Sequence, residues 1–558
     1  SPANKGAPFP QVQVQGVTGT RYDTGATITN GAVYFGTESS RQLNQIITKE
    51  TVGKFIAEYS VGDHTISGGA ESDSTKYRNA FVQYTDGYYT FSNITNWVAG
   101  TPPSAYQLAK AYSGFSINDA IANWKYEAYA LFIQDTIKVN SALTFMLGVR
   151  YDYPHIGQKP PVAAGFSSAG FNRPNGGAVT DNTTTNSGNE TIAPRVGFTY
   201  KFNTERKTQL RGGFGLFQGK NPAVWISNAY SNAGSVANAT ATSGQLPGIT
   251  FSPDVNNQPI PGGALGSPNI NVTDPKFRQP ALWKSNLAFD HQLPWGGINF
   301  TAEVYHNVVD SALNVEFLNY KIATDGPSVM PDGRVRYGTV SSITSSTTTS
   351  TAGRRRVTTG GPVGNGFADV FYLTNTRNGG ADGTTFSLSR PLKNNWGWSL
   401  SWTRGKATEV SPMTSSVASS NYSNRASFNP NEDRASISNT NIKDRIVGTF
   451  TRQFEFIKSN KTRVSFIWQS RTGHPYSWVF RGDANGDGYA FNDLLYVPAG
   501  PSDPKVAWAS ATERDAFFAF IQTNDLWKYQ GTHPERNSEV SPWLNTLDIR
   551  ISQEVPIW

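Results

Sequence analysis

One short stretch of the sequence places oxygen-bearing side chains at the spacing of a calcium-binding loop. Asp483, Asn485 and Asp487 alternate with small residues, and Gly488 follows directly. Carboxylate or amide oxygens at positions one, three and five, with glycine at position six, form the first half of such a loop. The stretch therefore predicts a calcium site, and its candidate ligands are Asp483, Asn485, Asp487, the carbonyl of Tyr489, and Asp493.

The second half of this stretch departs from the calcium pattern. Leu494 replaces the bidentate glutamate that usually stands at position twelve, and the nearest acid, Asp493, falls one position early. The same residues also suit a series of Asx and glycine turns in an extracellular loop. Both interpretations stay open at this point, and calcium is the one cofactor that the sequence suggests.

The sequence contains no other group of residues with the spacing of a catalytic or metal site. Its six histidines are scattered without metal-ligand spacing. The segment RGGFGLF (211–217) is typical of a strand with small residues on one face, and not of a phosphate loop. Cysteine is absent, which excludes disulfides and thiolate metal sites within this sequence. We therefore expect that the protein is not an enzyme.

The elements that carry these residues are predicted to be β-strands, and the clearest are in the stretch 129–152. Tyr129, Leu131 and Ile133 share one face of the first strand, and Leu147 and Val149 share one face of the second. Alternation with a period of two residues describes a sheet with one apolar and one wetter face. About ten such residues on a tilted strand cross the hydrocarbon core of a bilayer. The stretch therefore predicts a membrane-spanning hairpin.

The same pattern recurs along the chain as further hairpins and a last strand. These lie at 54–71, 196–216, 287–304, 386–402, 446–468 and 547–551. Short turns of about three to eight residues alternate with connections of about forty to seventy. Outer-membrane barrels have this asymmetry, with short periplasmic turns and long extracellular loops. The pattern therefore predicts an all-β, transmembrane antiparallel β-barrel with long extracellular loops.

The composition agrees with this class. Charged residues are only 16% of the 558 residues, and aromatic residues are 13%. No run of about 18 apolar residues occurs, which excludes spanning helices. The formal charge of +7 comes from scattered basic residues, so we expect no nucleic-acid partner. The low-complexity segment SSITSSTTTSTAGRRR (341–356) holds the one compact basic run and is expected to be mobile.

Several charged residues are predicted to face the inside of the barrel, where they pair with one another or with a plug. They are Arg150, Asp152, Arg195, Lys201, Arg211, Glu303, Asp548 and Arg550.

The motifs also resemble those of a known family. LFIQDTIKVNSALTFMLGVRYDY (131–153) resembles the hairpin typical of TonB-dependent outer-membrane receptors, and APRVGFTYKF (193–202) and RGGFGLF continue the match in order. The segment 274–307 is similar to the Oar-like subgroup, with one extra glycine at Gly297. The segments 473–498 and 536–556 are similar to that subgroup as well.

This resemblance implies a 22-stranded barrel filled by a plug domain and energised through a periplasmic TonB box. About twelve to fourteen strands are recognisable here. We therefore expect residues 53–558 to be the barrel portion, and residues 1–52 to be a weakly patterned part made of strands or an extracellular loop. The plug domain and the closing strands are expected outside this sequence.

The function implied by the resemblance is transport across the outer membrane of a Gram-negative bacterium. An unknown extracellular ligand would be captured by the long loops and passed through the plugged barrel. The expected partners are outer-membrane lipid and lipopolysaccharide, and the TonB system through the absent N-terminal region. One alternative is an adhesion or surface-scaffold protein on the same barrel. Another is a secreted carbohydrate-binding β-protein, which the Trp and Tyr content favours.

Overall fold

The fold was obtained as a computed structural model. It describes residues 8–220, 222–242, 246, 248–262, 265–320, 322–324, 326–337, 366–457 and 459–555. The low-complexity segment 341–356, which we expected to be mobile, lies outside the described residues.

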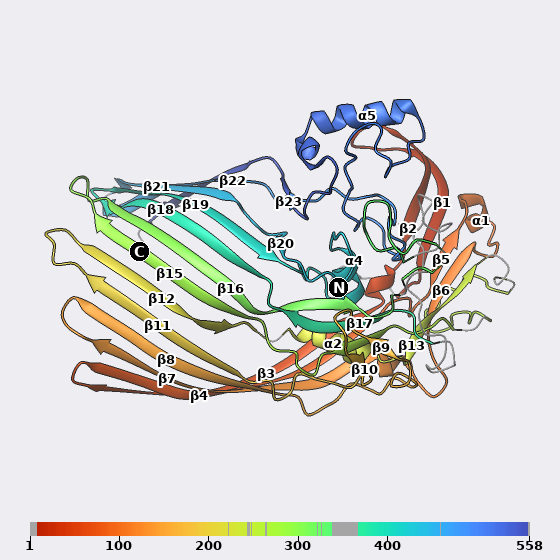
Figure 1. The fold of residues 1–558 in the computed structure, drawn as a ribbon, viewed down its shortest axis with the longest axis horizontal. Coiled ribbons are helices and arrows are strands. Elements are labelled where there is room, and N and C mark those ends of the chain that lie inside the picture. The colour runs from red at the N-terminus through yellow and green to blue at the C-terminus, as the bar shows by residue number, and fades with distance from the viewer. Residues whose placement is uncertain are drawn as a thin grey trace.

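The dominant element is a 16-stranded sheet in which neighbouring strands follow one another along the chain (Figure 1). Its main path runs through β3 (Leu43–Val61), β4 (His64–Val82), β7 (Ile121–Lys138), β8 (Leu143–His155), β11 (Thr191–Lys201), β12 (Thr208–Gln218), β15 (Ala281–Gln292), β16 (Asn299–Phe317), β18 (Gly379–Lys393), β19 (Trp396–Glu409), β21 (Asp444–Ile457), β22 (Asn460–Arg471) and β25 (Leu544–Gln553). Three short strands lie off this path, namely β14 (Ile270–Thr273), β17 (Val370–Thr376) and β20 (Ser436–Ile437).

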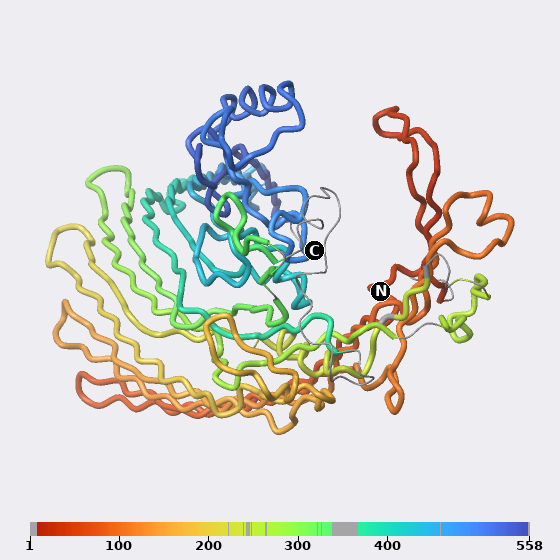
Figure 2. The backbone as a smooth tube through the Cα atoms, turned by 45° about the vertical axis from the view of Figure 1, so that its right-hand side comes forward, coloured from red at the N-terminus to blue at the C-terminus, as the bar shows by residue number. Residues whose placement is uncertain are grey.

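All pairings along the main path are antiparallel, and tight turns join the strands at one end of the sheet. In the turn between β3 and β4, Gly62 has φ +56°, a left-handed conformation that glycine adopts without steric cost. The sheet curves around its long connections, as Figure 2 shows from a second direction. The hairpins predicted from alternation are therefore confirmed, and so is the all-β antiparallel class.

The two faces of the sheet differ as the alternation predicts. On β7, Leu131 is 60% exposed and Ile133 is 56% exposed, while Ala130 is buried and Phe132 is half-buried on the opposite face. Cross-strand partners share a face, so the register Leu131 to Tyr151 extends the apolar surface onto β8. We call this apolar side of the sheet the outer face and the opposite side the inner face.

A second, five-stranded sheet stands at the end of the large sheet that carries the long connections (Figure 1). It consists of β1 (Gln11–Thr20), β2 (Thr27–Phe35), β5 (Tyr88–Phe91), β6 (Ala105–Ala111) and β13 (Val236–Thr242). Its core contains Val12, Tyr89 and Tyr106. Two small ribbons pair β9 (Phe171–Asn172) with β10 (Ala178–Val179) and β23 (Pro475–Tyr476) with β24 (Glu539–Val540).

The long connections also contain helices, which are α1 (Ile94–Val98), α2 (Ala223–Ser231), α4 (Ala418–Ser423) and α5 (Ala511–Gln522), and 3-10 turns at Ser39–Arg41, Ile117–Ala120 and Asp525–Tyr529. None of the helices among the described residues has the length and apolar character needed to cross a membrane. The helix α2 packs against the inner face of β7, where the indole of Trp124 donates to the Ser227 hydroxyl at 2.9 Å. The connection that contains α2 is therefore folded and packs against the inner face of the sheet.

The N-terminal part differs in detail from the expected division of the chain. The first strand of the large sheet begins at Leu43, so the expected boundary between residues 52 and 53 falls inside β3. This strand is exposed on both faces over nearly its whole length, and its first ten residues lack a clear apolar alternation. Without that alternation, residues 43–52 give no period-two signal of a strand.

Candidate functional site

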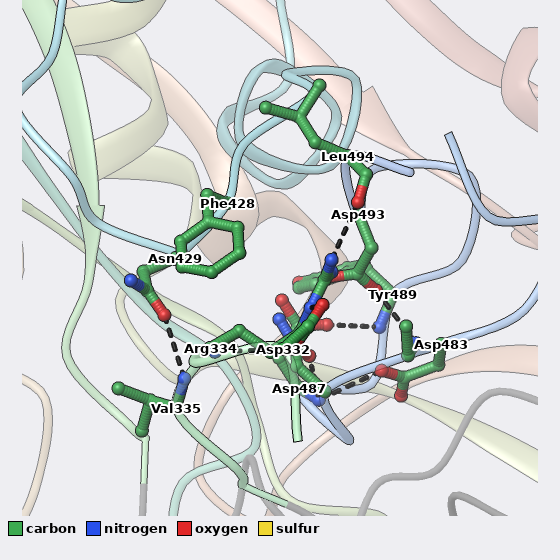
Figure 3. Close-up of polar contacts among 12 residues, drawn as sticks. Asp332, Arg334, Val335, Phe428, Asn429, Asp483, Asp487, Tyr489, Asp493 and Leu494 are labelled. Atoms are coloured by element: carbon green, nitrogen blue, oxygen red, sulfur yellow. Dashed lines mark hydrogen bonds and ion pairs between the residues drawn. The ribbon is translucent and has the colours of Figure 1, made fainter. Parts of the chain in front are cut away.

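The predicted calcium stretch folds as a tight loop between β23 and α5 (Figure 3). The Asp483 carboxylate accepts hydrogen bonds from the backbone N–H groups of Gly486 at 2.7 Å and Gly488 at 2.8 Å. Asn485 Oδ1 accepts from the Asp487 N–H at 2.8 Å, and Asp487 Oδ1 accepts from the Tyr489 N–H at 2.8 Å. These are Asx-type turns, in which the side chain of one residue closes the backbone that follows it.

The loop is buried, although it belongs to a connection between strands. Asn485 and Asp487 are each 1% exposed, and Asp493 is 2% exposed. The Tyr320 hydroxyl donates to Asp487 Oδ2 at 3.4 Å, and the Tyr489 ring packs against the largest apolar core of the inner face. The sequence-predicted side chains are therefore brought together inside the protein.

Arg334 is a buried residue of this site that could not be identified from the sequence. Its side chain is 1% exposed, and it forms ion pairs with Asp332 at 2.7 Å and with Asp493 Oδ1 at 3.2 Å (Figure 3). Its Nη2 group donates to the Leu494 carbonyl at 2.6 Å. A buried guanidinium with this many partners fixes its neighbours in position.

Several carboxylates gather near the buried guanidinium of Arg334. Those of Asp332, Asp483, Asp487 and Asp493 are drawn with it in Figure 3. Burial raises the pKa of Asp487 well above its ordinary value, and the nearby Asp493 and Asp483 carboxylates raise this pKa further. Burial likewise raises the pKa of Asp493 to about 7, although Arg334 opposes this shift. The site therefore favours uptake of a positive charge, as a proton or as a cation.

The loop offers oxygen atoms of the kinds that bind calcium. Carboxylate, amide and backbone oxygens are the ligands that calcium prefers, and the loop supplies all three kinds. In the described part of the chain, however, no group of three or more His, Cys, Asp or Glu side chains is arranged to hold a metal ion. Asp493 directs its oxygens to Arg334 and to the Ala484 N–H at 2.8 Å. The chemistry of the donor set fits calcium, and Asp493 has an alternative partner.

The raised pKa values predict how the stability of the loop depends on pH. The folded pKa of Asp493, about 7, lies above the ordinary value of 3.8, so the folded loop holds a proton that the unfolded chain releases. Stability from this group is therefore fully present below about pH 4 and is lost as the pH rises to 7. We expect the segment 475–500 to resist proteinase K better at pH 5 than at pH 8. The cleavage rate at each pH is divided by the rate for an unstructured substrate, which corrects for the activity of the protease itself. Resistance that increases with pH would contradict the proposed protonation.

The predicted inward-facing charges form two networks on the inner face. Arg150 of β8 pairs with Asp152 at 2.9 Å and, across β7, with Glu71 of β4 at 3.1 Å. Arg211 pairs with Asp290 at 3.1 Å and with Glu303 at 3.5 Å. These pairs join strands that lie far apart in the sequence.

The other four predicted charges are placed differently. Arg195 lies over the Phe217 ring with 4.6 Å from its Cζ to the ring centre. Lys201, Asp548 and Arg550 are exposed near the strand ends or on the edge strand β25. The structure thus brings Arg150 and Asp152 together, and Arg211 and Glu303, and it leaves Lys201, Asp548 and Arg550 apart from these pairs.

The comparison with protein families identifies the class. The family model described as "Outer membrane beta barrel domain" matches residues 2–558. The chain therefore belongs to this family, and its location is the outer membrane of a Gram-negative cell. A comparison with curated proteins gives no match.

Solved structures with a similar arrangement of strands include three transporters. The copper transporter OprC is 11% identical, with a TM-score of 0.39, over 80% of this chain and 47% of that chain. The outer membrane transporter YddB from Escherichia coli is 10% identical, with a TM-score of 0.42, over 96% of this chain and 51% of that one. The FrpB iron transporter from Neisseria meningitidis is 8% identical, with a TM-score of 0.39, over 79% of this chain and 47% of that chain. The chain thus spans about half the length of the solved structures that it matches.

Proposed function

We propose that this chain is the barrel portion of a TonB-dependent outer-membrane transporter of the Oar-like type. The observation that carries this proposal is the order of the sequence motifs from 131–153 to 536–556 within a chain of the outer-membrane barrel family. The proposal also includes a plug domain and a TonB-contacting segment, which would be other parts of the protein. The long connections capture an extracellular ligand, and displacement of the plug by the TonB system releases it inward, without covalent chemistry.

The arrangement of the inner face supports this role. The long connections pack over one end of the sheet with cores built around Tyr230, Phe317 and Tyr422. Below these connections, the charge networks of Arg150 and Arg211 present polar groups to the interior. A polar interior beneath ordered outer loops is what a ligand-conducting barrel needs.

Nutrient depletion tests this proposal against the adhesion alternative. Cells carrying the complete gene and cells lacking it are grown in the same complex medium, with and without a protonophore, and the media are compared by mass spectrometry. Transport predicts that at least one compound disappears faster only from energised cells that carry the gene. An adhesion protein instead predicts equal depletion together with loss of surface attachment in the deletion strain. The latter result would overturn the transport proposal.

We also propose that calcium binds the loop through Asp483, Asn485, Asp487, Asp493 and the Tyr489 carbonyl. The buried oxygen atoms of Asn485, Asp487 and Asp493, which this loop brings together, support this proposal. Bound calcium would hold the loop closed at the higher pH values at which protons no longer neutralise the loop's carboxylates. One millimolar calcium should therefore restore protease resistance of the segment 475–500 at pH 8, and the Asp487→Asn variant should lose this response. Calorimetry that detects no calcium binding at millimolar concentration would refute the proposal.

A further inference from the structure

Three lysines form a row across neighbouring strands on the outer face. Lys49 of β3 is the direct cross-strand partner of Lys76 of β4, and Lys76 is the partner of Lys125 of β7. Lys125 lies on the same side of β7 as Leu131, because both stand at odd positions of a strand with continuous register. The row therefore points outward, in line with the apolar surface of the sheet.

Like charges directly opposite one another destabilise a sheet, and little in the chain compensates this row. Lys125 pairs with Glu127 of its own strand at 2.6 Å. Arg78 adds a further positive charge on the same face of β4, two residues beyond Lys76, where it donates to Gln45 at 2.7 Å. Within the described residues, neither Lys49 nor Lys76 has an ion pair with a carboxylate. The patch thus combines four cations with one carboxylate and needs an external anion.

An apolar groove of about 720 Å³ lies beside this patch on the same four strands, β3, β4, β7 and β8. Small residues line part of it, namely Gly53, Ala70 and Ser72, and larger ones stand around them, namely Phe55, Tyr129, Leu131, Tyr151 and Tyr153. The partners Phe55, Ala70, Leu131 and Tyr151 follow one another across the strands on the outer face. The groove is therefore open to the surroundings of the barrel and suits an extended hydrocarbon chain.

The distance between the basic patch and the apolar groove suits an amphiphilic molecule, which has a polar head group and a hydrocarbon chain. Tyr129 lies in the groove, and Lys125 lies four residues before it on β7, about 14 Å away at ~3.4 Å per strand residue. The Tyr129 hydroxyl donates to Glu127 at 3.3 Å, which places the polar end of this aromatic ring toward the lysines. Such an order of apolar groove, tyrosine and cations is typical of the interface between hydrocarbon and head groups.

We propose that the outer face of β3, β4, β7 and β8 is a binding site for a phosphate-bearing lipid. Lys49, Lys76 and Lys125 with Arg78 bind the phosphate of the head group, and the groove between Phe55 and Leu131 holds one acyl chain. The lysine row lies at the end of the sheet opposite the short turn 139–142, which is the outer-leaflet end of a barrel with periplasmic turns. The lipid is therefore a phosphorylated lipid of the outer leaflet, and lipopolysaccharide has this chemistry.

The test measures lipid bound to the purified full-length protein by native mass spectrometry, with rough lipopolysaccharide as the probe and diacylglycerol, which has no phosphate and no charge, as the comparison. Wild-type protein should retain lipopolysaccharide in preference to diacylglycerol. The double variant K49Q/K76Q should retain about tenfold less, because two cations near the phosphate are lost. The matched control is K138Q/K207Q, which removes two exposed lysines at the short-turn end and should retain as much as wild type. Equal retention by all three proteins would overturn the proposal.

A second variant tests the groove independently of charge. A Cβ added at Gly53 meets no atom within 4 Å, so Gly53→Leu places a side chain in the groove without a clash. This variant should also lose about tenfold of the bound lipid, whereas ten millimolar inorganic phosphate should not displace lipid from wild type. Displacement by phosphate, or unchanged binding to Gly53→Leu, would show an adventitious ionic contact and refute the two-part site. Lipid retention does not depend on nutrient uptake, so the result is separate from the transport proposal.

Discussion

Replacing Arg334 with methionine is expected to open the connection that contains the acidic loop. The guanidinium carbon lies 5.2 Å from the ring centres of Phe428 and Phe480, and methionine fills similar space beside these rings without the positive charge. The substitution leaves Asp332 and Asp493 buried without their counter-charge. Removing one partner of a buried ion pair typically costs about 3–5 kcal/mol. The free energy of local opening should therefore fall by about this amount, while the strands stay intact.

Hydrogen exchange measures this effect directly, because it reports opening of the segment 475–500 separately from the strands. Arg434→Met is the matched control, since its ion pair with Glu535 is more than half exposed and is expected to contribute less than about 1 kcal/mol. The double variant R334M/D493N should recover part of the protection, because the asparagine oxygen can still accept from the Ala484 N–H. If the segment 475–500 exchanged at the same rate in R334M as in wild type, the ion pairs would not be what holds the loop closed.

Placing arginine on the two faces of β7 is expected to give opposite results. Ile133 is 56% exposed on the outer face, between Gly68 of β4 and Val149 of β8. An arginine facing lipid near the middle of the bilayer costs about 2–4 kcal/mol. Ile133→Arg should therefore reduce the amount of folded protein in the outer membrane several-fold.

The adjacent Gln134 provides the matched control, because it lies on the inner face opposite Gly148. Gln134→Arg adds the same charge one residue away, where polar residues and water surround it, and it should assemble like wild type. Folded protein is measured by its altered gel mobility without heating and by the stability of the purified barrel to urea. If both variants assembled equally well, the assignment of the outer face to lipid would be wrong.

Much of the large sheet could be predicted from the sequence, because strand patterning is a local property. The alternation of Leu147 and Val149 with small or polar residues predicted β8 and its partner, and both are present. The short turns followed from polar and glycine-rich residues between alternating runs. The first half of β3 was missed because residues 43–52 lack a clear apolar alternation. The five-stranded sheet was missed because its strand β13 comes more than a hundred residues after β6, the strand with which it pairs.

In the acidic site, the local loop geometry could be predicted from the sequence, whereas the long-range partner Arg334 could not. The spacing of Asp483, Asn485 and Asp487 predicted a loop that holds its oxygens together, and that geometry is local. Arg334 could not be predicted, because it comes from a connection far away in the sequence and reaches Asp493 only in the folded chain. The single available signal was a basic residue beside Asp332 in a turn-rich segment, and many such segments occur in this chain.

We expect the long connections of this outer-membrane barrel to face the outside of the cell, where the proposed ligand would be captured. The sequence has no cysteine, so single cysteines can be introduced as unique labels. Arg514 of α5 marks a long connection and Glu205 marks a short turn, and both positions are accessible on the surface. Intact cells with Arg514→Cys should react with a membrane-impermeant maleimide, whereas Glu205→Cys should react only after the outer membrane is permeabilised. Labelling of Glu205→Cys in intact cells, with Arg514→Cys protected, would contradict the account.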